Sequence, residues 1–185
     1  MVLKKIEDRT YEGARGRVAV IVADFHQEMT NGMLQGLEEV FEQYGEVSWQ
    51  VHRVPGAFEI PLMAQKLASM VQVGEEPALN PDPLSSLAEA SEGQKKGETI
   101  PAEEGIFDVI VVLGCVVKGD TYHFELVANE CARGCMDVML RFDIPLVFEV
   151  LAPYTYEAGM KRSQGEFNHG KLAAFTALDW LKKLK

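Results

Sequence analysis

The residues best suited to chemistry follow the longest apolar stretch of the chain. Residues 107–117 run almost without a polar interruption, and the residues that follow at the predicted first turn of the next helix include Gly119, Asp120, Thr121 and His123. Histidine is the side chain best suited to proton transfer near neutral pH. Backbone amides at the start of a helix can bind a phosphate group, although helix capping by Asp120 or Thr121 would explain the same residues. This stretch therefore predicts a proton-transfer group beside a candidate anion site.

Three phenylalanines, Phe25, Phe58 and Phe148, stand at or near the carboxyl ends of the other predicted strands. Flat heterocyclic ligands stack on such rings, although a single phenylalanine is more often part of a core. Arg162, with Lys161 beside it, could bind the same anion, although a basic pair is more often a solvated surface. Together these residues predict an aromatic ligand next to the anion.

The elements that must position these residues alternate between strands and helices. Strand patterns cover residues 17–23, 47–54, 107–117 and 144–151, and the second alternates apolar and polar residues as an edge strand does. An amphipathic helical pattern follows each strand. The alternation predicts a four-stranded parallel sheet between two helix layers, which is a three-layer α/β/α flavodoxin-like arrangement. Ligands of such sheets bind at the carboxyl ends of the strands, where the candidate residues fall.

The chain of 185 residues is predicted to be a single domain with two irregular regions. Residues 1–16 mix charges and glycines without a period, so we expect an N-terminal arm there. Residues 74–105 are rich in proline, glycine and glutamate and are long for a connection, so we expect a mobile insertion. Because the insertion joins a helix to a strand, it is expected at the amino edge of the sheet, away from the candidate site.

The composition disfavours several classes of function. A formal net charge of −10 argues against nucleic acid or an anionic membrane as the main partner. No apolar run approaches the roughly 20 residues that cross a bilayer, and no secretory signal is visible, so we expect a cytoplasmic location. The three cysteines are an odd number within apolar patterns and are expected to be reduced and buried.

A metal site and a nucleotide site are both disfavoured. His123 and Glu125, followed by Cys131 and Cys135, partly match the pattern of zinc deaminases. The two cysteines are separated by three residues rather than two, lack the preceding proline and fit the apolar stripe of a helix, so no metal ligation is expected. The glycine-rich motifs of dinucleotide and nucleoside triphosphate enzymes are absent, and so is a serine nucleophile elbow.

Four motifs resemble those of the 6,7-dimethyl-8-ribityllumazine synthase family: VAVIVADF at 18–25, VPGAFEIP at 54–61, LGCVVKGDTYHF at 113–124 and NHG at 168–170. The resemblance covers nearly the whole chain apart from the arm and the insertion. It implies a transferase of riboflavin biosynthesis, which condenses 5-amino-6-(D-ribitylamino)uracil with 3,4-dihydroxy-2-butanone 4-phosphate to give the lumazine, phosphate and water. It also implies that no metal or cofactor is needed. A non-catalytic relative that forms the shell or binds a flavin-like ligand is the open alternative.

The resemblance also implies a role for each matched residue. His123 would move protons, and Arg162 with Asp120 and Thr121 would hold the phosphate. The other substrate-binding residues that it implies are Phe25 for stacking on the pyrimidine, Ala57, Phe58 and Glu59 for the ribityl chain, Cys115, Val116 and Val117 for the ring edge, Phe148 for the pocket wall, and His169, where the family often has lysine.

The same resemblance implies an assembly. Phe148 and Arg162 would come from the neighbouring subunit, so the site would exist only between subunits, and family members assemble as pentamers or multiples of pentamers. A homo-oligomer with two small-molecule substrates is therefore expected. Some positions depart from the family pattern: His26 replaces a usual asparagine, and residues 152 and 153 replace paired threonines.

Overall fold

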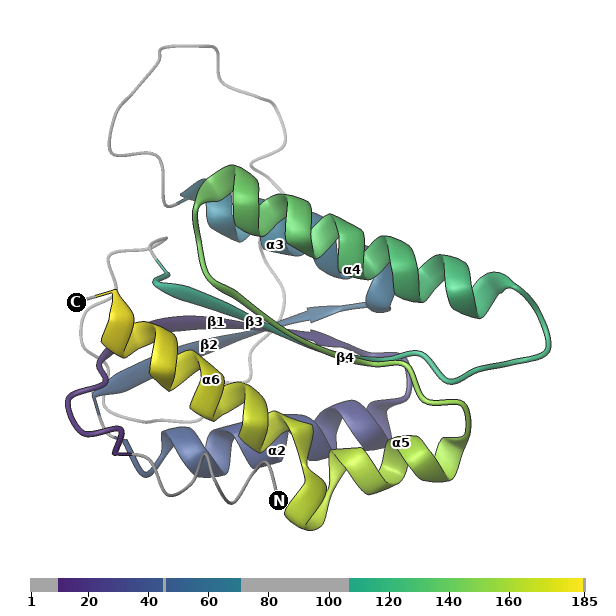
Figure 1. The fold of residues 1–185 in the computed structure, drawn as a ribbon, viewed down its shortest axis with the longest axis horizontal. Coiled ribbons are helices and arrows are strands. Elements are labelled where there is room, and N and C mark those ends of the chain that lie inside the picture. The colour runs from purple at the N-terminus through teal and green to yellow at the C-terminus, as the bar shows by residue number, and fades with distance from the viewer. Residues whose placement is uncertain (1–9, 45, 71–106, 185) are drawn as a thin grey trace, which may run out of the picture.

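The computed structural model describes residues 10–44, 46–70 and 107–184. The described strands form one parallel sheet with helices on both faces (Figure 1). The strands are β1 (Gly16–Ala23), β2 (Val47–Val54), β3 (Val109–Cys115) and β4 (Leu146–Leu151). The helices are α2 (Gln27–Phe41), η1 (Ala57–Glu59), α3 (Ile60–Met70), α4 (His123–Phe142), α5 (Tyr156–Ser163), η2 (Gly165–Phe167) and α6 (His169–Lys183), of which η1 and η2 are short 3₁₀ helices. The predicted three-layer α/β/α flavodoxin-like fold is confirmed.

The strands lie in the order β2-β1-β3-β4, and every neighbouring pair is parallel. The strand over residues 47–54 is at an edge, as its alternating residues predicted. Two predicted strands are longer than the observed ones: the 107–117 stretch pairs only over Val109–Cys115, and the 144–151 stretch only from Leu146. Apolar sequence marks burial rather than pairing, and Pro145, which has no amide hydrogen to donate, precedes the start of β4.

The central strands supply two separate cores because alternate side chains point to opposite faces. Val18, Val20 and Val22 of β1 belong to the core under α2 and α6, whereas Ala19, Ile21 and Ala23 belong to the core under α3 and α4. Figure 1 shows α2, α5 and α6 covering one face of the sheet and α3 and α4 covering the other. Burial on both faces explains why β1 and β3 are nearly continuous apolar runs.

Residues 10–16, the second half of the predicted N-terminal arm, pack on this domain. Tyr11 is 1% exposed, and its ring lies 5.2 Å from that of Phe175 and 5.8 Å from that of Tyr44. The Lys182 ammonium also donates a hydrogen bond to the carbonyl of Thr10 at 2.6 Å. This half of the predicted arm therefore contributes Tyr11 and Ala14 to the core. Residues 1–9 and the predicted 74–105 insertion lie outside the described residues, so the insertion and the single-domain assignment stay predictions.

All three cysteines of the chain are free thiols and buried, as predicted. Cys131 and Cys135 lie on the core side of α4, where the contact between the two thiols raises the pKa of Cys135. Among the described residues, no group of three or more His, Cys, Asp or Glu side chains is arranged to hold a metal ion. None of the described helices is long and apolar enough to cross a membrane.

Candidate functional site

The connections that follow the four strands leave the sheet at one edge. Ala23 pairs with Val54 at the ends of β1 and β2, and Cys115 pairs with Leu151 at the ends of β3 and β4. Backbone pairing continues just beyond the strands, since the amide of Asp24 donates to the Val54 carbonyl at 2.8 Å. The sheet therefore brings segments that are far apart in the sequence to a common carboxyl edge.

Phe25 stands on the connection between β1 and α2 with 65% of its surface exposed. The neighbouring His26 has a left-handed backbone (φ 58°), and its ring meets that of Phe25 edge-on with centroids 4.8 Å apart. On the other side, Asp24 pairs with Arg53 of β2 at 3.3 Å, and the same guanidinium donates to the side chain of Asn31 at 2.7 Å. The residues on both sides of Phe25 thus make contacts of their own, while the Phe25 ring stays exposed.

The Arg53 contacts were missed by sequence reasoning. The sequence did contain a signal: Asp24 follows β1, Arg53 lies near the end of β2, and the fold places these two strands side by side. Because the basic residue falls on the exposed side of an edge strand, its charge alone did not distinguish it from a solvated surface residue.

Ala57, Phe58 and Glu59 form the short helix η1 at the end of β2. Ala57 is buried, Glu59 is half-buried and Phe58 is 59% exposed. Phe58 also lines a groove of about 710 Å³ between α3 and α4, together with residues such as Leu62 and Arg133. No other predicted site residue lines this groove, so the groove does not mark the predicted site.

Cys115, Val116 and Val117 lead out of β3 toward α4. The Cys115 thiol is buried and lies 3.3 Å from the Met29 sulfur, and burial raises its pKa to about 11. The side chain therefore stays protonated at neutral pH and faces the core. Only the backbone of Cys115 is available to a ligand at the carboxyl edge, and Val116 and Val117 are half-buried beside it.

Gly119, Asp120 and Thr121 lie in the connection before α4 and not in its first turn, which corrects the sequence prediction. The helix begins at His123, and its N-cap residue Tyr122 makes no side-chain capping hydrogen bond, so capping by Asp120 or Thr121 is not seen. Residues 119–121 and His123 are all exposed. The spacing of apolar residues predicted which face of α4 is buried, but it did not predict the residue at which the helix begins.

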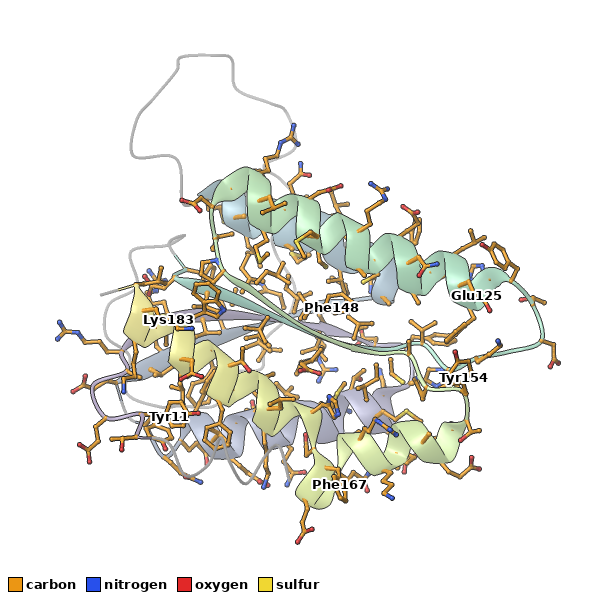
Figure 2. All side chains as sticks on the ribbon, viewed as in Figure 1. Tyr11, Glu125, Phe148, Tyr154, Phe167 and Lys183 are labelled. Atoms are coloured by element: carbon orange, nitrogen blue, oxygen red, sulfur yellow. The ribbon has the colours of Figure 1, made fainter. Side chains whose placement is uncertain are left out.

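We call the predicted residues that lie at the carboxyl edge the edge group: Phe25, Ala57, Phe58, Glu59, Cys115, Val116, Val117, Asp120, Thr121 and His123. The remaining predicted residues, Phe148, Arg162 and His169, form what we call the side group. Phe148 lies in the middle of β4, paired with Val112, and is 37% exposed. Figure 2 shows Phe148 well away from Glu125 and Tyr154, which mark the carboxyl edge. One chain therefore does not bring all the predicted residues together.

The other two members of the side group are held by contacts within the chain. Arg162 is exposed in the last turn of α5, which runs away from the carboxyl edge (Figure 1), and it donates to the carbonyl of Ala158 at 3.0 Å. His169 is the first residue of α6, and its Nδ1 lies 2.8 Å from a carboxylate oxygen of Glu149 on β4. A charged partner on the edge strand thus fixes the imidazole of His169.

The NHG motif at 168–170 has a structural role in this region. Asn168 is 4% exposed, accepts a hydrogen bond from the Gly170 amide at 2.7 Å and donates one to the Gly32 carbonyl at 2.8 Å. A side chain on Gly170 would overlap the carbonyl oxygen of Met33, so only glycine permits this approach of α6 to α2. The motif locks the backbone on both sides of His169.

Comparison with known proteins agrees with the motifs. A family model described as 6,7-dimethyl-8-ribityllumazine synthase matches residues 15–77 and 97–185, which leaves residues 78–96, within the predicted insertion, unmatched. Relatives with that same name include a protein of Ruthia magnifica, 34% identical over 91% of this chain and 85% of its own length. Others are proteins of Thermococcus gammatolerans (32% identical, 97% and 99% covered) and Thermococcus kodakarensis (30% identical, 98% and 94% covered). The chain therefore belongs to the 6,7-dimethyl-8-ribityllumazine synthase family, a family of transferases of riboflavin biosynthesis.

Proposed function

We propose that the edge group of one copy and the side group of a neighbouring copy together form the site that condenses 5-amino-6-(D-ribitylamino)uracil with 3,4-dihydroxy-2-butanone 4-phosphate. The observation that carries this proposal is the convergence, on one sheet edge, of the exposed Phe25 ring, the exposed 119–121 connection and the exposed His123 imidazole. These are the three kinds of group that an aromatic amine, a phosphate ester and a proton transfer require.

The pyrimidine substrate would stack on the exposed ring of Phe25. The ribityl chain would lie along Ala57, Phe58 and Glu59, where a half-buried carboxylate can accept hydrogen bonds from hydroxyl groups. The backbone of Cys115, Val116 and Val117 would bind the polar edge of the ring. This arrangement would hold the amine in place for attack on the ketone.

The phosphate of the second substrate would bind between the 119–121 connection and the guanidinium of Arg162 from the neighbouring copy. The first amides of a helix of 20 residues have no partner within the helix and attract an anion, and an arginine can bind phosphate through two parallel hydrogen bonds. Asp120 and Thr121 would line this subsite, and Phe148 and His169 of the neighbouring copy would close the pocket.

His123 would move protons at three points of the reaction. It would help water leave as the amine and ketone form an imine, take a proton next to that imine as phosphate leaves, and assist loss of water when the second amine closes the ring. An imidazole suits this alternation because it can accept and donate a proton near neutral pH. The amine and ketone react on their own, so positioning is the larger part of what the protein contributes.

This reading requires a homo-oligomer, and we propose a pentamer or a multiple of pentamers on the family resemblance. In one chain the side group is built on β4, α5 and α6 and not on the carboxyl edge, which supports a site shared between copies. A cytoplasmic location also stays a prediction from the sequence.

The proposal is tested by mixing the purified protein with both substrates. We expect the absorbance of the lumazine and inorganic phosphate to appear in equal amounts, faster than in the protein-free mixture, together with an oligomer by mass measurement in solution. A monomeric protein that turns over at full rate would contradict the shared site. An oligomer that does not accelerate the reaction would instead indicate a non-catalytic relative.

A further inference from the structure

The lysine next to the proposed phosphate subsite contacts one carboxylate, two aromatic rings and one backbone carbonyl. The ammonium of Lys118 lies 3.4 Å from a carboxylate oxygen of Glu125 on α4. It also lies 5.8 Å from the centre of the Phe124 ring and 5.1 Å from that of the Tyr154 ring. The backbone amide of Lys118 donates to the Pro153 carbonyl at 3.0 Å. The side chain and the backbone of this lysine are thus both fixed.

These contacts join two connections of the carboxyl edge. Phe124 and Glu125 belong to the first turn of α4, whereas Pro153 and Tyr154 belong to the connection between β4 and α5. The Phe124 and Tyr154 rings lie 6.3 Å apart, with the ammonium close to both. Figure 2 shows Glu125 and Tyr154 at the same end of the molecule.

We propose that Lys118 is a positioning residue, whose ammonium between the two rings and Glu125 fixes the 119–121 connection in the conformation that receives the substrate phosphate. This inference rests on the proposed phosphate subsite. Gly119 has no side chain to anchor the connection, and a Cβ added there would meet no atom within 4 Å. Residue 118 therefore provides the anchor closest to the residues that would bind the anion.

A direct ligand role for Lys118 is the main alternative, and its contacts argue against it. The ammonium already has a carboxylate partner and two aromatic rings. Binding the phosphate directly would require it to leave these partners. Positioning needs no such rearrangement, because a fixed connection loses less conformational freedom when the anion binds.

The test is the steady-state kinetics of Lys118→Met, which keeps most of the side-chain volume and removes the charge. We expect the KM for the phosphate substrate to rise by about 5-fold to 10-fold, with kcat and the KM for the pyrimidine changed by less than about 2-fold. Lys118→Arg should recover most of the loss, because a guanidinium can make the same contacts. Lys183→Met is the matched control, since Lys183 also lies over a ring, that of Trp180 at 5.3 Å, at the far end of α6.

The Glu125→Gln variant distinguishes a positioning role of Lys118 from direct attraction of the phosphate by the Lys118 charge. Removing the negative charge of Glu125 would lower the KM for the phosphate substrate if Lys118 only attracted the anion. It should raise that KM by about 2-fold to 3-fold if Glu125 holds Lys118 in place. Tyr154→Leu should raise it as well. These two variants also carry the test if Lys118→Met does not fold.

Calorimetric titration with inorganic phosphate gives a readout that does not depend on turnover. The Kd of Lys118→Met for phosphate should exceed that of the native protein by about the same factor as its KM for the phosphate substrate. The Kd of Lys183→Met should equal that of the native protein. Unchanged phosphate binding in Lys118→Met, alongside weaker binding in Thr121→Val, would overturn this inference and leave the proposed subsite standing. Unchanged binding in both variants would overturn the subsite itself and the inference with it.

Discussion

The edge group and the side group are held in place by different parts of the fold. The edge group lies at the carboxyl ends of strands, on the connections and short helix η1 that follow them, at the last residue of β3 and at the first residue of α4, and its rings and His123 are exposed there. The side group lies on the elements themselves, in β4, in the last turn of α5 and at the start of α6. Within one chain, therefore, the carboxyl edge carries the exposed Phe25 ring and the His123 imidazole, whereas Arg162 and Phe148 lie elsewhere, and the proposed site needs both groups.

The largest effect is expected for His123→Ala, within the edge group. We expect kcat to fall on the order of 10²-fold, because a general acid and base contributes at least that much to such proton transfers. The oligomer should remain intact, since the side chain is exposed on the first residue of α4. The measurement is lumazine formation with the mass in solution as a check, and Asn129→Ala on the same helix is the control. Turnover as fast as in the native protein would show that His123 has no catalytic role.

The second expected effect comes from combining defects of the two groups. Co-expression of His123→Ala and Arg162→Ala chains in equal amounts should give oligomers in which about a quarter of the shared sites carry neither defect. Activity at a low concentration of the phosphate substrate should then reach about a quarter of the native value, well above either variant alone. A site contained within one chain would instead give only the mean of the two variants.

Arg162→Ala should have a smaller effect, on substrate affinity. We expect the KM for the phosphate substrate to rise about 10-fold or more, with the KM for the pyrimidine little changed, because a charge-assisted contact is lost only on the phosphate. Arg141→Ala is a matched control, since Arg141 is also an exposed arginine in the last turn of a helix. Equal rises for both substrates would indicate a structural role for Arg162.

Asn168→Ala should destabilise the side group without touching the edge group. Two hydrogen bonds of a buried amide would be lost, at a cost of about 1 to 3 kcal/mol in the free energy of unfolding. Chemical denaturation measures this loss. The substitution should also raise the KM for substrate, because the backbone at His169 would no longer be fixed. Lost stability with an unchanged KM would limit the motif to a structural role.

The smallest effect concerns pH and the histidine beside Phe25. Burial lowers the pKa of His26 and of His52 below the usual 6.5. The unfolded chain therefore binds more protons than the folded protein in the window below 6.5, so the free energy of unfolding should fall as the pH is lowered through that value. His26→Asn should reduce this slope and leave the part due to His52. It should also stabilise the protein by about 0.5 kcal/mol, because asparagine tolerates the left-handed backbone better.

Much of the fold could be predicted because the spacing of apolar residues along this chain matches the observed strands and helices. The alternating residues of 47–54 gave an edge strand, and the continuous apolar run around residue 111 gave a central one. The convergence of Phe25, Phe58 and His123 followed from one rule, that parallel strands bring their carboxyl ends to the same edge. The helical period likewise placed Cys131 and Cys135 in the core of α4.

What could not be predicted depends on contacts between distant residues. The burial of Tyr11 requires the rings of Tyr44 and Phe175, which local sequence does not connect. The Cys115 thiol points into the core because of the register of β3 within the sheet. This direction, which leaves only the Cys115 backbone available to a ligand, could not be predicted from local sequence. The separation of the edge group from the side group likewise depends on where α5 and α6 lie, and residue types alone do not fix this.

The packing of Tyr11 has a practical consequence for handling the protein. Tyr11 is anchored close to the first residue of β1, whereas the proposed site lies beyond the last residue of that eight-residue strand. The two ends of that strand are about 25 Å apart. A dye or affinity handle placed near Tyr11 would therefore modify the end of the sheet opposite the carboxyl edge, provided that the Tyr11 ring keeps its contacts with Tyr44 and Phe175.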